Sequence, residues 1–186
     1  MSLKIQETSL PGVLLIEPKV FKDSRGFFME TFHKGKYEEG GIDQDFVQDN
    51  YSHSSSGTLR GLHYQLKHPQ GKLVYVITGE IFDVAVDIRY GSPTFGQWGG
   101  FTLSSENRRQ VYIPEGFAHG FCVLSESADV LYKCTDVYKP DDEYGIMWSD
   151  QTMSIEWPVI KPNVSDKDRQ YSELREIPSH HLPLFT

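Results

Sequence analysis

Two histidines stand in segments where their side chains could transfer protons or hold a metal ion. His63 lies in the extended segment Leu62–Gln65, and His119 follows the turn Pro114-Glu115-Gly116. In that turn proline ends one strand and glycine permits a tight reversal, so His119 is predicted to begin the next strand and point inward. Since the unperturbed pKa of histidine is about 6.5, both rings can exchange protons near neutral pH.

The spacing Pro-x-Gly-x-x-His in a chain of short strands resembles the second motif of the cupin barrels. In that superfamily this histidine usually binds a metal together with an upstream His-x-His pair. Here glutamine occupies the second upstream position, in His63-Tyr64-Gln65, and the usual acidic ligand has no counterpart. A tight transition-metal site needs about three or four ligands. We therefore predict a metal-free site; a metal-dependent cupin dioxygenase or isomerase is the alternative, which metal analysis of the purified protein would distinguish.

Six separated blocks extend this resemblance to one family. In order and spacing they resemble the dTDP-4-dehydrorhamnose 3,5-epimerase family, and the match runs from about Gly12 to Asp168. Any single block would be a weak signal, whereas agreement across all of them is specific. The blocks are Asp23–Phe28, Phe46–Ser52, Leu59–Gln65, Gln70–Val74, Ser92–Trp98 and Pro114–Gly120.

The resemblance implies an isomerase of dTDP-L-rhamnose biosynthesis that inverts C3 and C5 of a dTDP-linked 4-keto-6-deoxyhexose. The C4 carbonyl acidifies both C–H bonds, so inversion requires a base on one face, an acid on the other and a stabilised enolate oxygen. No cofactor is required. By resemblance His63 is the base, Asp168 orients it, Tyr132 donates the proton, and Lys72 is the cation beside the C4 oxygen.

Two of these assignments have structural alternatives. Tyr132 could be an ordinary core tyrosine in a strand, and Lys72 could be an exposed lysine at a strand end. If Tyr132 is the acid, its reference pKa of about 10 keeps the phenol protonated at neutral pH.

The resemblance also assigns side chains that bind the nucleotide sugar. Arg25, Arg60 and Lys167 match positions that hold the diphosphate or the sugar, and a guanidinium can donate two hydrogen bonds to phosphate at once. Gln48 and Asn50 match thymidine-recognition positions, where amides can read an imide edge. The remaining candidates are the ligand contacts Glu30, His119 and Glu143, and the stacking rings Tyr138 and Phe27, with core packing as the alternative for Phe27.

The elements that must position these residues are short extended runs separated by turn residues, which is typical of an all-β sandwich or barrel. The run Ile81–Arg89 alternates with the β period of two, and Asp83 on its polar face is a candidate partner for His63 or His119. The predicted strands are Gly12–Glu17, Gly26–Phe32, Phe46–His53, Leu59–Gln65, Lys72–Thr78, Glu80–Arg89, Gln97–Leu103, Arg109–Ile113, Gly120–Leu124, Asp129–Asp136 and Tyr144–Trp148.

Helical signals are few. His33–Gly40 ends at a Gly-Gly stop, and Ser165–Leu174 carries Ser165 as a possible N-cap. We therefore predict an all-β, cupin-type jelly-roll barrel or sandwich with a few short helices. It is predicted to form a single domain over residues 1–186, with a tail at about 175–186 that packs along the body.

Composition excludes several other classes of protein. The chain has 186 residues, and 18 Lys+Arg against 26 Asp+Glu give a formal net charge of −8. An acidic chain lacks the basic face that general nucleic-acid binding needs. No aliphatic run approaches the roughly 18 residues of a membrane span, and no export signal is visible. Cys122 and Cys134 fall in strand-like runs and are predicted to be reduced core residues of a cytoplasmic protein.

The N-terminal segment Gly12–Phe32 predicts a homodimer. In the family such segments pair with the sheet of the other subunit and lend residues to its site, and Arg25 and Glu30 fall in this segment. The related activities, a 3-epimerase or a 3,4-ketoisomerase, remain alternatives because the resemblance does not fix whether both carbons are inverted. A non-catalytic nucleotide-sugar-binding protein is a further alternative, against which the presence of His63, Tyr132 and Asp168 argues.

Overall fold

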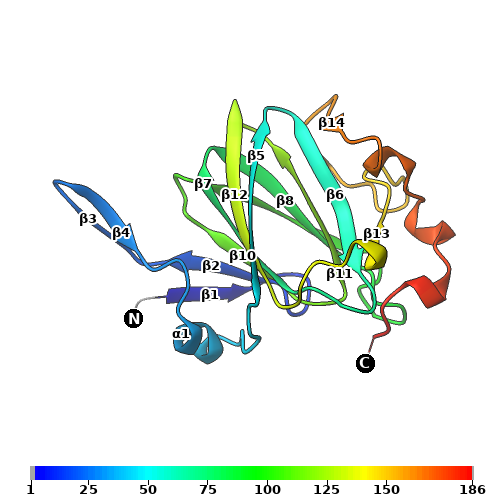
Figure 1. The fold of residues 1–186 in the computed structure, drawn as a ribbon, viewed down its shortest axis with the longest axis horizontal. Coiled ribbons are helices and arrows are strands. Elements are labelled where there is room, and N and C mark those ends of the chain that lie inside the picture. Colours follow the sequence, from blue (N-terminus) through cyan, green and yellow to red (C-terminus); the bar gives the residue numbers. More distant parts are fainter. Residues whose placement is uncertain (1–2, 186) are drawn as a thin grey trace.

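Two antiparallel sheets face each other in the computed structural model, which describes residues 3–185 (Figure 1). The arrangement confirms the predicted all-β sandwich. The first sheet contains, in spatial order, β1 (Leu3–Glu7), β2 (Leu14–Pro18), β10 (Gln110–Ile113), β7 (Lys72–Thr78), β12 (Ser127–Cys134) and β5 (Gln48–Ser55). The second contains β13 (Glu143–Gly145), β6 (Thr58–Gln65), β11 (Phe117–Val123), β8 (Glu80–Asp87) and β9 (Trp98–Ser104), and β14 (Asn163–Val164) pairs with β6 in parallel.

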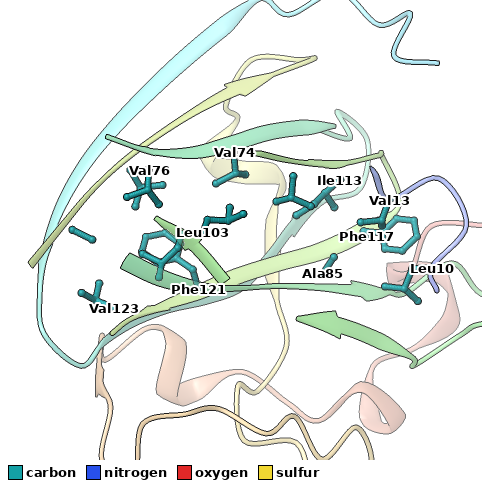
Figure 2. Close-up of a cluster of buried hydrophobic side chains, with 14 residues drawn as sticks. Leu10, Val13, Val74, Val76, Ala85, Leu103, Ile113, Phe117, Phe121 and Val123 are labelled. Atoms are coloured by element: carbon teal, nitrogen blue, oxygen red, sulfur yellow. The ribbon is translucent and has the colours of Figure 1, made fainter. Parts of the chain in front are cut away.

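An apolar core fills part of the space between the sheets (Figure 2). It explains the alternation in β8, since Ile81 and Ala85 enter this core while Val84 and Val86 belong to a second cluster on the other face. Phe121 of β11 also belongs to the core and at the same time lines the cavity described below. The core side chains labelled in Figure 2 are Leu10, Val13, Val74, Val76, Ala85, Leu103, Ile113, Phe117, Phe121 and Val123.

The segment after β13 covers the outer face of the second sheet. Leu174 and Leu182 are buried there together with Val84 and Val86. The backbone N–H of Tyr90 donates to the carbonyl of Pro183 at 2.7 Å, which holds the end of the segment on the body. The prediction that the tail packs along the body is therefore confirmed for the residues that the structure describes.

One of the two predicted helices is confirmed. α1 (Lys34–Glu39) begins after His33, whose side chain accepts a hydrogen bond from the N–H of Lys36, and it ends at Gly40. The prediction of a helix over Ser165–Leu174 is wrong. This segment contains the separate 3₁₀ turns η2 (Asp168–Gln170) and η3 (Leu174–Glu176), because Asp168 and the N–H of Leu174 bond to groups outside the segment. Further 3₁₀ turns are η1 (Pro140–Asp142) and η4 (Ser179–His181).

A two-stranded hairpin extends away from both sheets at the N-terminal side of the molecule (Figure 1). It consists of β3 (Val20–Asp23) and β4 (Gly26–Met29), which form a separate two-stranded sheet. Its aromatic side chains Phe21, Phe27 and Phe28 are exposed. The hairpin therefore presents apolar surface that is exposed among residues 3–185.

Cys122 and Cys134 are both buried and are not joined to each other, as predicted. Within residues 3–185 we find no helix of the length and apolarity that a membrane crossing requires.

Candidate active site

A cavity of about 750 Å³ lies between the two sheets, next to the apolar core. Pockets for small ligands typically measure about 300–1,000 Å³, so this cavity has the volume of a small-ligand site. The walls come from β5, β7 and β12 of the first sheet, from β6 and β11 of the second, and from the segments 138–143 and 163–168. Eleven of the thirteen predicted site residues line it: Gln48, Asn50, Arg60, His63, Lys72, His119, Tyr132, Tyr138, Glu143, Lys167 and Asp168.

His63 and Asp168 form a hydrogen-bonded pair. The Nε2 atom of His63 lies 2.7 Å from Oδ1 of Asp168, and the other carboxylate oxygen accepts from the N–H of Gly61 at 3.2 Å. The carboxylate is buried, whereas 27% of the His63 side chain is exposed. Because an ionised carboxylate can only accept, Nε2 carries the proton and Nδ1 is the ring nitrogen with a free lone pair.

The surroundings of Asp168 keep it ionised. Burial alone would raise the pKa of this carboxyl, but the hydrogen bonds from His63, Gly61 and Ser165 and the charge of His63 outweigh burial and lower the pKa. A negative Asp168 stabilises the imidazolium that forms when His63 accepts a proton. The pair has the chemistry of an oriented general base.

His119 lies opposite His63 on the neighbouring strand, and its Nε2 bonds to Asp83 Oδ2 at 2.8 Å. The prediction that Asp83 supports one of the two histidines is confirmed for His119. The strands approach very closely here: a Cβ on Gly61 would lie 2.7 Å from Gly120 Cα, so only glycine allows this contact. The close approach coincides with a register shift that places both imidazoles on the cavity wall.

Tyr132 and Lys72 stand on the opposite sheet. In the pairing of β12 with β7, Tyr132 is opposite Val74 and Lys72 is opposite Cys134, so both cavity residues share the inner face. Burial raises the pKa of Tyr132, which keeps the phenol protonated at neutral pH. Burial also lowers the pKa of Lys72, although the nearby Cys134, Asp83 and Glu143 oppose this shift. Lys72 is buried, which contradicts the alternative of an exposed lysine at a strand end.

A row of polar side chains on β5 forms another part of the wall. Gln48, Asn50 and Ser52 alternate along the strand and all line the cavity. Gln48 donates to Asn50 Oδ1 at 3.0 Å, and its own carbonyl accepts from the N–H of Tyr138 at 2.8 Å. Ser52 was not among the predicted residues, although its spacing of two from Asn50 was the available signal. Gln70 and Phe121 are further lining residues that sequence reasoning missed.

Glu143, Lys167 and Tyr138 form a polar network on the cavity wall. Glu143 Oε2 accepts from the ammonium of Lys167 at 2.8 Å and from the hydroxyl of Tyr138 at 2.7 Å. Although burial would raise the pKa of Glu143, these two donors and the charges of His63 and Lys167 lower it. The network places one carboxylate and one ammonium where a polar ligand can replace their mutual contact.

The structure does not bring Arg25 and Glu30 to this cavity. Arg25 lies at the turn of the β3–β4 hairpin, where its highly exposed guanidinium pairs with Asp23 at 2.7 Å. Glu30 pairs with Lys36 of α1. Phe27 is exposed on the same hairpin, which contradicts the alternative that it packs in the core. Tyr138, in contrast, lines the cavity.

Gln65, at the position of the second cupin histidine, has a structural role. Its amide nitrogen donates to the carbonyls of His68 at 2.6 Å and Val137 at 3.3 Å, while its oxygen accepts from the N–H of Lys139 at 2.7 Å. All of the amide is thus used to join two loops. Within residues 3–185, no cluster of three or more His, Cys, Asp or Glu side chains has the arrangement of a metal site.

Known proteins are similar to this chain in both sequence and fold. The family model described as dTDP-4-dehydrorhamnose 3,5-epimerase matches residues 7–176. A dTDP-4-dehydrorhamnose 3,5-epimerase of Shigella flexneri is 58% identical over 168 residues, covering 89% of this chain and 93% of that protein. One of Neisseria gonorrhoeae is 58% identical over 167 residues, which cover 89% of this chain, and the chain spans about half (51%) of that relative.

Among solved structures, the chain is similar to a dTDP-6-deoxy-D-glucose-3,5-epimerase of Legionella pneumophila, determined in complex with dTDP-4-keto-L-rhamnose. The TM-score is 0.97 at 52% sequence identity, and the match covers 99% of each chain. The likeness therefore includes the two sheets and the segment that covers the second sheet.

Proposed function

The chain belongs to the dTDP-4-dehydrorhamnose 3,5-epimerase family, a family of isomerases with the cupin-type fold, and we propose that it inverts C3 and C5 of a dTDP-linked 4-keto-6-deoxyhexose. The reaction converts dTDP-4-dehydro-6-deoxy-D-glucose to dTDP-4-dehydro-L-rhamnose. The observation that carries this proposal is the placement of an oriented base, His63, and a protonated phenol, Tyr132, on opposite walls of one cavity.

The proposed reaction proceeds through an enolate. Nδ1 of His63 removes the proton from C3 or C5, and the electron pair of that C–H bond moves onto the C4 oxygen. Lys72 stabilises the enolate more than the neutral ketone, which lowers the barrier. Tyr132 then delivers a proton to the same carbon from the opposite face. The phenolate regains a proton from solvent and the imidazolium loses one, so the site is reset for the second carbon.

The polar walls support binding of the nucleotide. Gln48 and Asn50 present amides that match an imide edge such as that of thymine. Arg60 and Lys167 supply positive charge for the diphosphate, and Tyr138 supplies a ring for stacking. This assignment needs focused cations and no overall basic surface, in agreement with the acidic composition.

We also propose that the active form is a homodimer whose β3–β4 hairpins cross to the partner's cavity. The support is that Arg25 and Glu30, which the resemblance places at the ligand, lie outside the cavity of their own chain. The exposed Phe27 and Phe28 supply apolar surface for such a contact. The buried, unpaired Cys122 and Cys134 support a reducing, cytoplasmic location.

Incubation with dTDP-4-keto-6-deoxyglucose in deuterated water tests the reaction. Deuterium is expected at both C3 and C5 of the product, where NMR detects it. Label at C3 alone would identify a 3-epimerase, and a shift of the keto group would identify a ketoisomerase. Bound substrate that acquires no label would identify a binding protein without catalysis.

A further inference from the structure

The imidazole of His63 is contacted by an aromatic ring that is not part of the cavity wall. The rings of His63 and Tyr171 lie edge to face, with centroids 5.9 Å apart and an interplanar angle of 74°. Tyr171 is not among the described residues that line the cavity. An effect of Tyr171 on the reaction would therefore pass through His63.

One short segment presents both Asp168 and Tyr171 to this imidazole. Asp168 begins the turn η2, and Tyr171 follows it in an extended conformation with φ −69° and ψ 152°. The next residue is anchored, because the carbonyl of Ser172 accepts from the N–H of Met147 at 2.9 Å. The backbone thus holds the carboxylate and the phenol ring on the same histidine.

Gly145 provides the space that the phenol ring occupies. Gly145 pairs directly with His63 across β13 and β6. A Cβ at this position would lie 2.1 to 2.4 Å from three carbons of the Tyr171 ring, which real atoms do not tolerate. The backbone of Gly145 is not among those with positive φ, so it is the ring and no special conformation that excludes a side chain here.

We propose that Tyr171 is a positioning residue that fixes the orientation of the His63 imidazole, and that Gly145 is required to seat it. The proposal rests on the proposed role of His63 as the base. With Nε2 held by Asp168 and the imidazole in a T-shaped contact with the Tyr171 ring, the imidazole has little freedom to rotate away from the carbon that it deprotonates. Aromatic edge-to-face contacts are favourable in themselves, and small misplacements of a catalytic group are costly to rate.

The phenol of Tyr171 does not compete as a base. Burial raises its pKa, and the carboxylates of Glu143 and Asp168 raise it further, so the hydroxyl stays neutral at physiological pH. The ring and not the hydroxyl should therefore matter, which makes Tyr171→Phe the matched control for Tyr171→Ala.

Steady-state kinetics on four variants test the proposal. Tyr171→Ala should lower kcat about tenfold with little change in KM, and Tyr171→Phe should remain near wild type. Gly145→Ala should be impaired like Tyr171→Ala because its Cβ displaces the ring. In the double variant the glycine substitution should add little, since the ring it displaces is already gone.

Nitrogen-15 NMR of the His63 ring supplies a readout other than activity. Wild type should show the tautomer protonated at Nε2, and Tyr171→Ala should shift both ring nitrogens toward a tautomer mixture. If thermal melting shows that Tyr171→Ala does not fold, Tyr171→Leu takes its place, since leucine keeps apolar bulk without the ring.

Three outcomes would overturn the proposal: wild-type kcat and nitrogen shifts in Tyr171→Ala, equal damage in Tyr171→Phe, or fully additive losses in the double variant. A wild-type level of turnover in His63→Ala would instead overturn the proposed role of His63 as the base, and a wild-type protein that does not turn the substrate over would overturn the proposed function itself.

Discussion

Lys72 is a buried ammonium group for which the structure shows no ion-pair partner within residues 3–185. Such a group is costly to bury because the charged form loses its hydration. An enolate oxygen in the cavity would supply the missing negative charge at the step where it is needed. Under the proposed mechanism, the buried charge of Lys72 lowers the stability of the free protein but also lowers the energy of the transition state.

Lys72→Met should separate these two effects. We expect turnover to fall by about 10²-fold or more, the usual loss for a group that stabilises developing charge, while the melting temperature stays equal or rises. Lys67→Met, which changes an exposed lysine, is the control and should alter neither. A melting temperature well below wild type would show that the ammonium is satisfied in the resting protein.

The pH dependence of activity should show the loss of charge on Lys72. Because burial lowers the pKa of Lys72, its charge is lost at a lower pH than that of a free lysine. Activity should therefore decline on the alkaline side as the ammonium loses its proton. In Lys72→Met that decline should be absent from the residual activity.

Tyr132→Phe should uncouple proton exchange from inversion. The base on the second sheet can still remove a proton, but the protonated phenol on the first sheet is missing, so C–H exchange persists while epimerisation slows. His63→Ala is the matched comparison and should lose both, with turnover reduced by about 10² or more. Deuterium incorporation and product formation, measured on one sample, distinguish the two variants. If Tyr132→Phe loses C–H exchange and epimerisation equally, Tyr132 is instead needed to form the enolate.

At the scale of elements, Asp87 at the end of β8 organises the turn that leads into β9. Its buried carboxylate accepts from Ser92 Oγ and Thr94 Oγ1 at 2.6 Å each and from the guanidinium of Arg89 at 2.8 and 2.9 Å. Burial alone would raise the pKa of Asp87, but these donors outweigh it and lower the pKa. The carboxylate thus contributes stability while it is ionised.

Asp87→Asn should lower the free energy of unfolding by about 2 kcal/mol at neutral pH, because charged hydrogen bonds are lost and donors are left unpaired. A lowered folded-state pKa means that this stabilisation is complete above the unfolded pKa, near 4, and is lost as the pH falls through the folded value. The difference between wild type and variant should therefore shrink below about pH 4 in chemical denaturation. Asp45→Asn, at an exposed ion pair with Lys34, is the control and should change little at any pH.

Strands with a strong period of two could be predicted from the sequence, and others could not. β7 was predicted with its exact bounds, and β8 to within two residues, because their apolar residues alternate or run continuously. β1 was missed because its pairing with β2 is decided by tertiary contact and its own residues are mixed in polarity. The Ser165–Leu174 segment looked helical through its capping residues, but the Asp168 side chain bonds to His63 on β6, and the N–H of Leu174 donates to Asp150 in the loop after β13.

The cavity residues were predictable where the family resemblance or a strand period indicated them. Tyr171 carried neither signal. Its ring packs over Gly145 and contacts His63, and both of these residues are distant from it in the sequence. Ser52 could have been found from the alternation of Gln48 and Asn50. The position of Arg25 outside the cavity of its own chain agrees with what the resemblance implied, because in the family the N-terminal segment lends its residues to the site of the other subunit.

At the scale of the whole molecule, mixed dimers test whether the hairpin serves the partner. One subunit carries Arg25→Ala and the other His63→Ala, with different affinity tags so that only mixed dimers are purified. If hairpins cross, one site combines an intact His63 with an intact Arg25, and the mixed dimer should regain about half of the wild-type activity. Each pure variant should be strongly impaired.

Two outcomes contradict this arrangement. A mixed dimer as inactive as its parents would place Arg25 in the cavity of its own subunit. Light scattering that reports the mass of one chain for a fully active enzyme would contradict the proposed dimer altogether.

Deletion of residues 1–32, which removes the hairpin and β1 and β2, should abolish both association and activity.

The bond between His63 and Asp168 joins residues 105 positions apart, and this has a consequence during synthesis on the ribosome. Chains emerge at about 5–20 residues per second, so the strands through β13 can pair before Asp168 leaves the exit tunnel. A nascent chain at that stage has most of the cavity wall and lacks the carboxylate that orients its histidine. Translation that stops short of residue 168 is therefore expected to yield a fragment that retains the amides of β5 but does not turn substrate over.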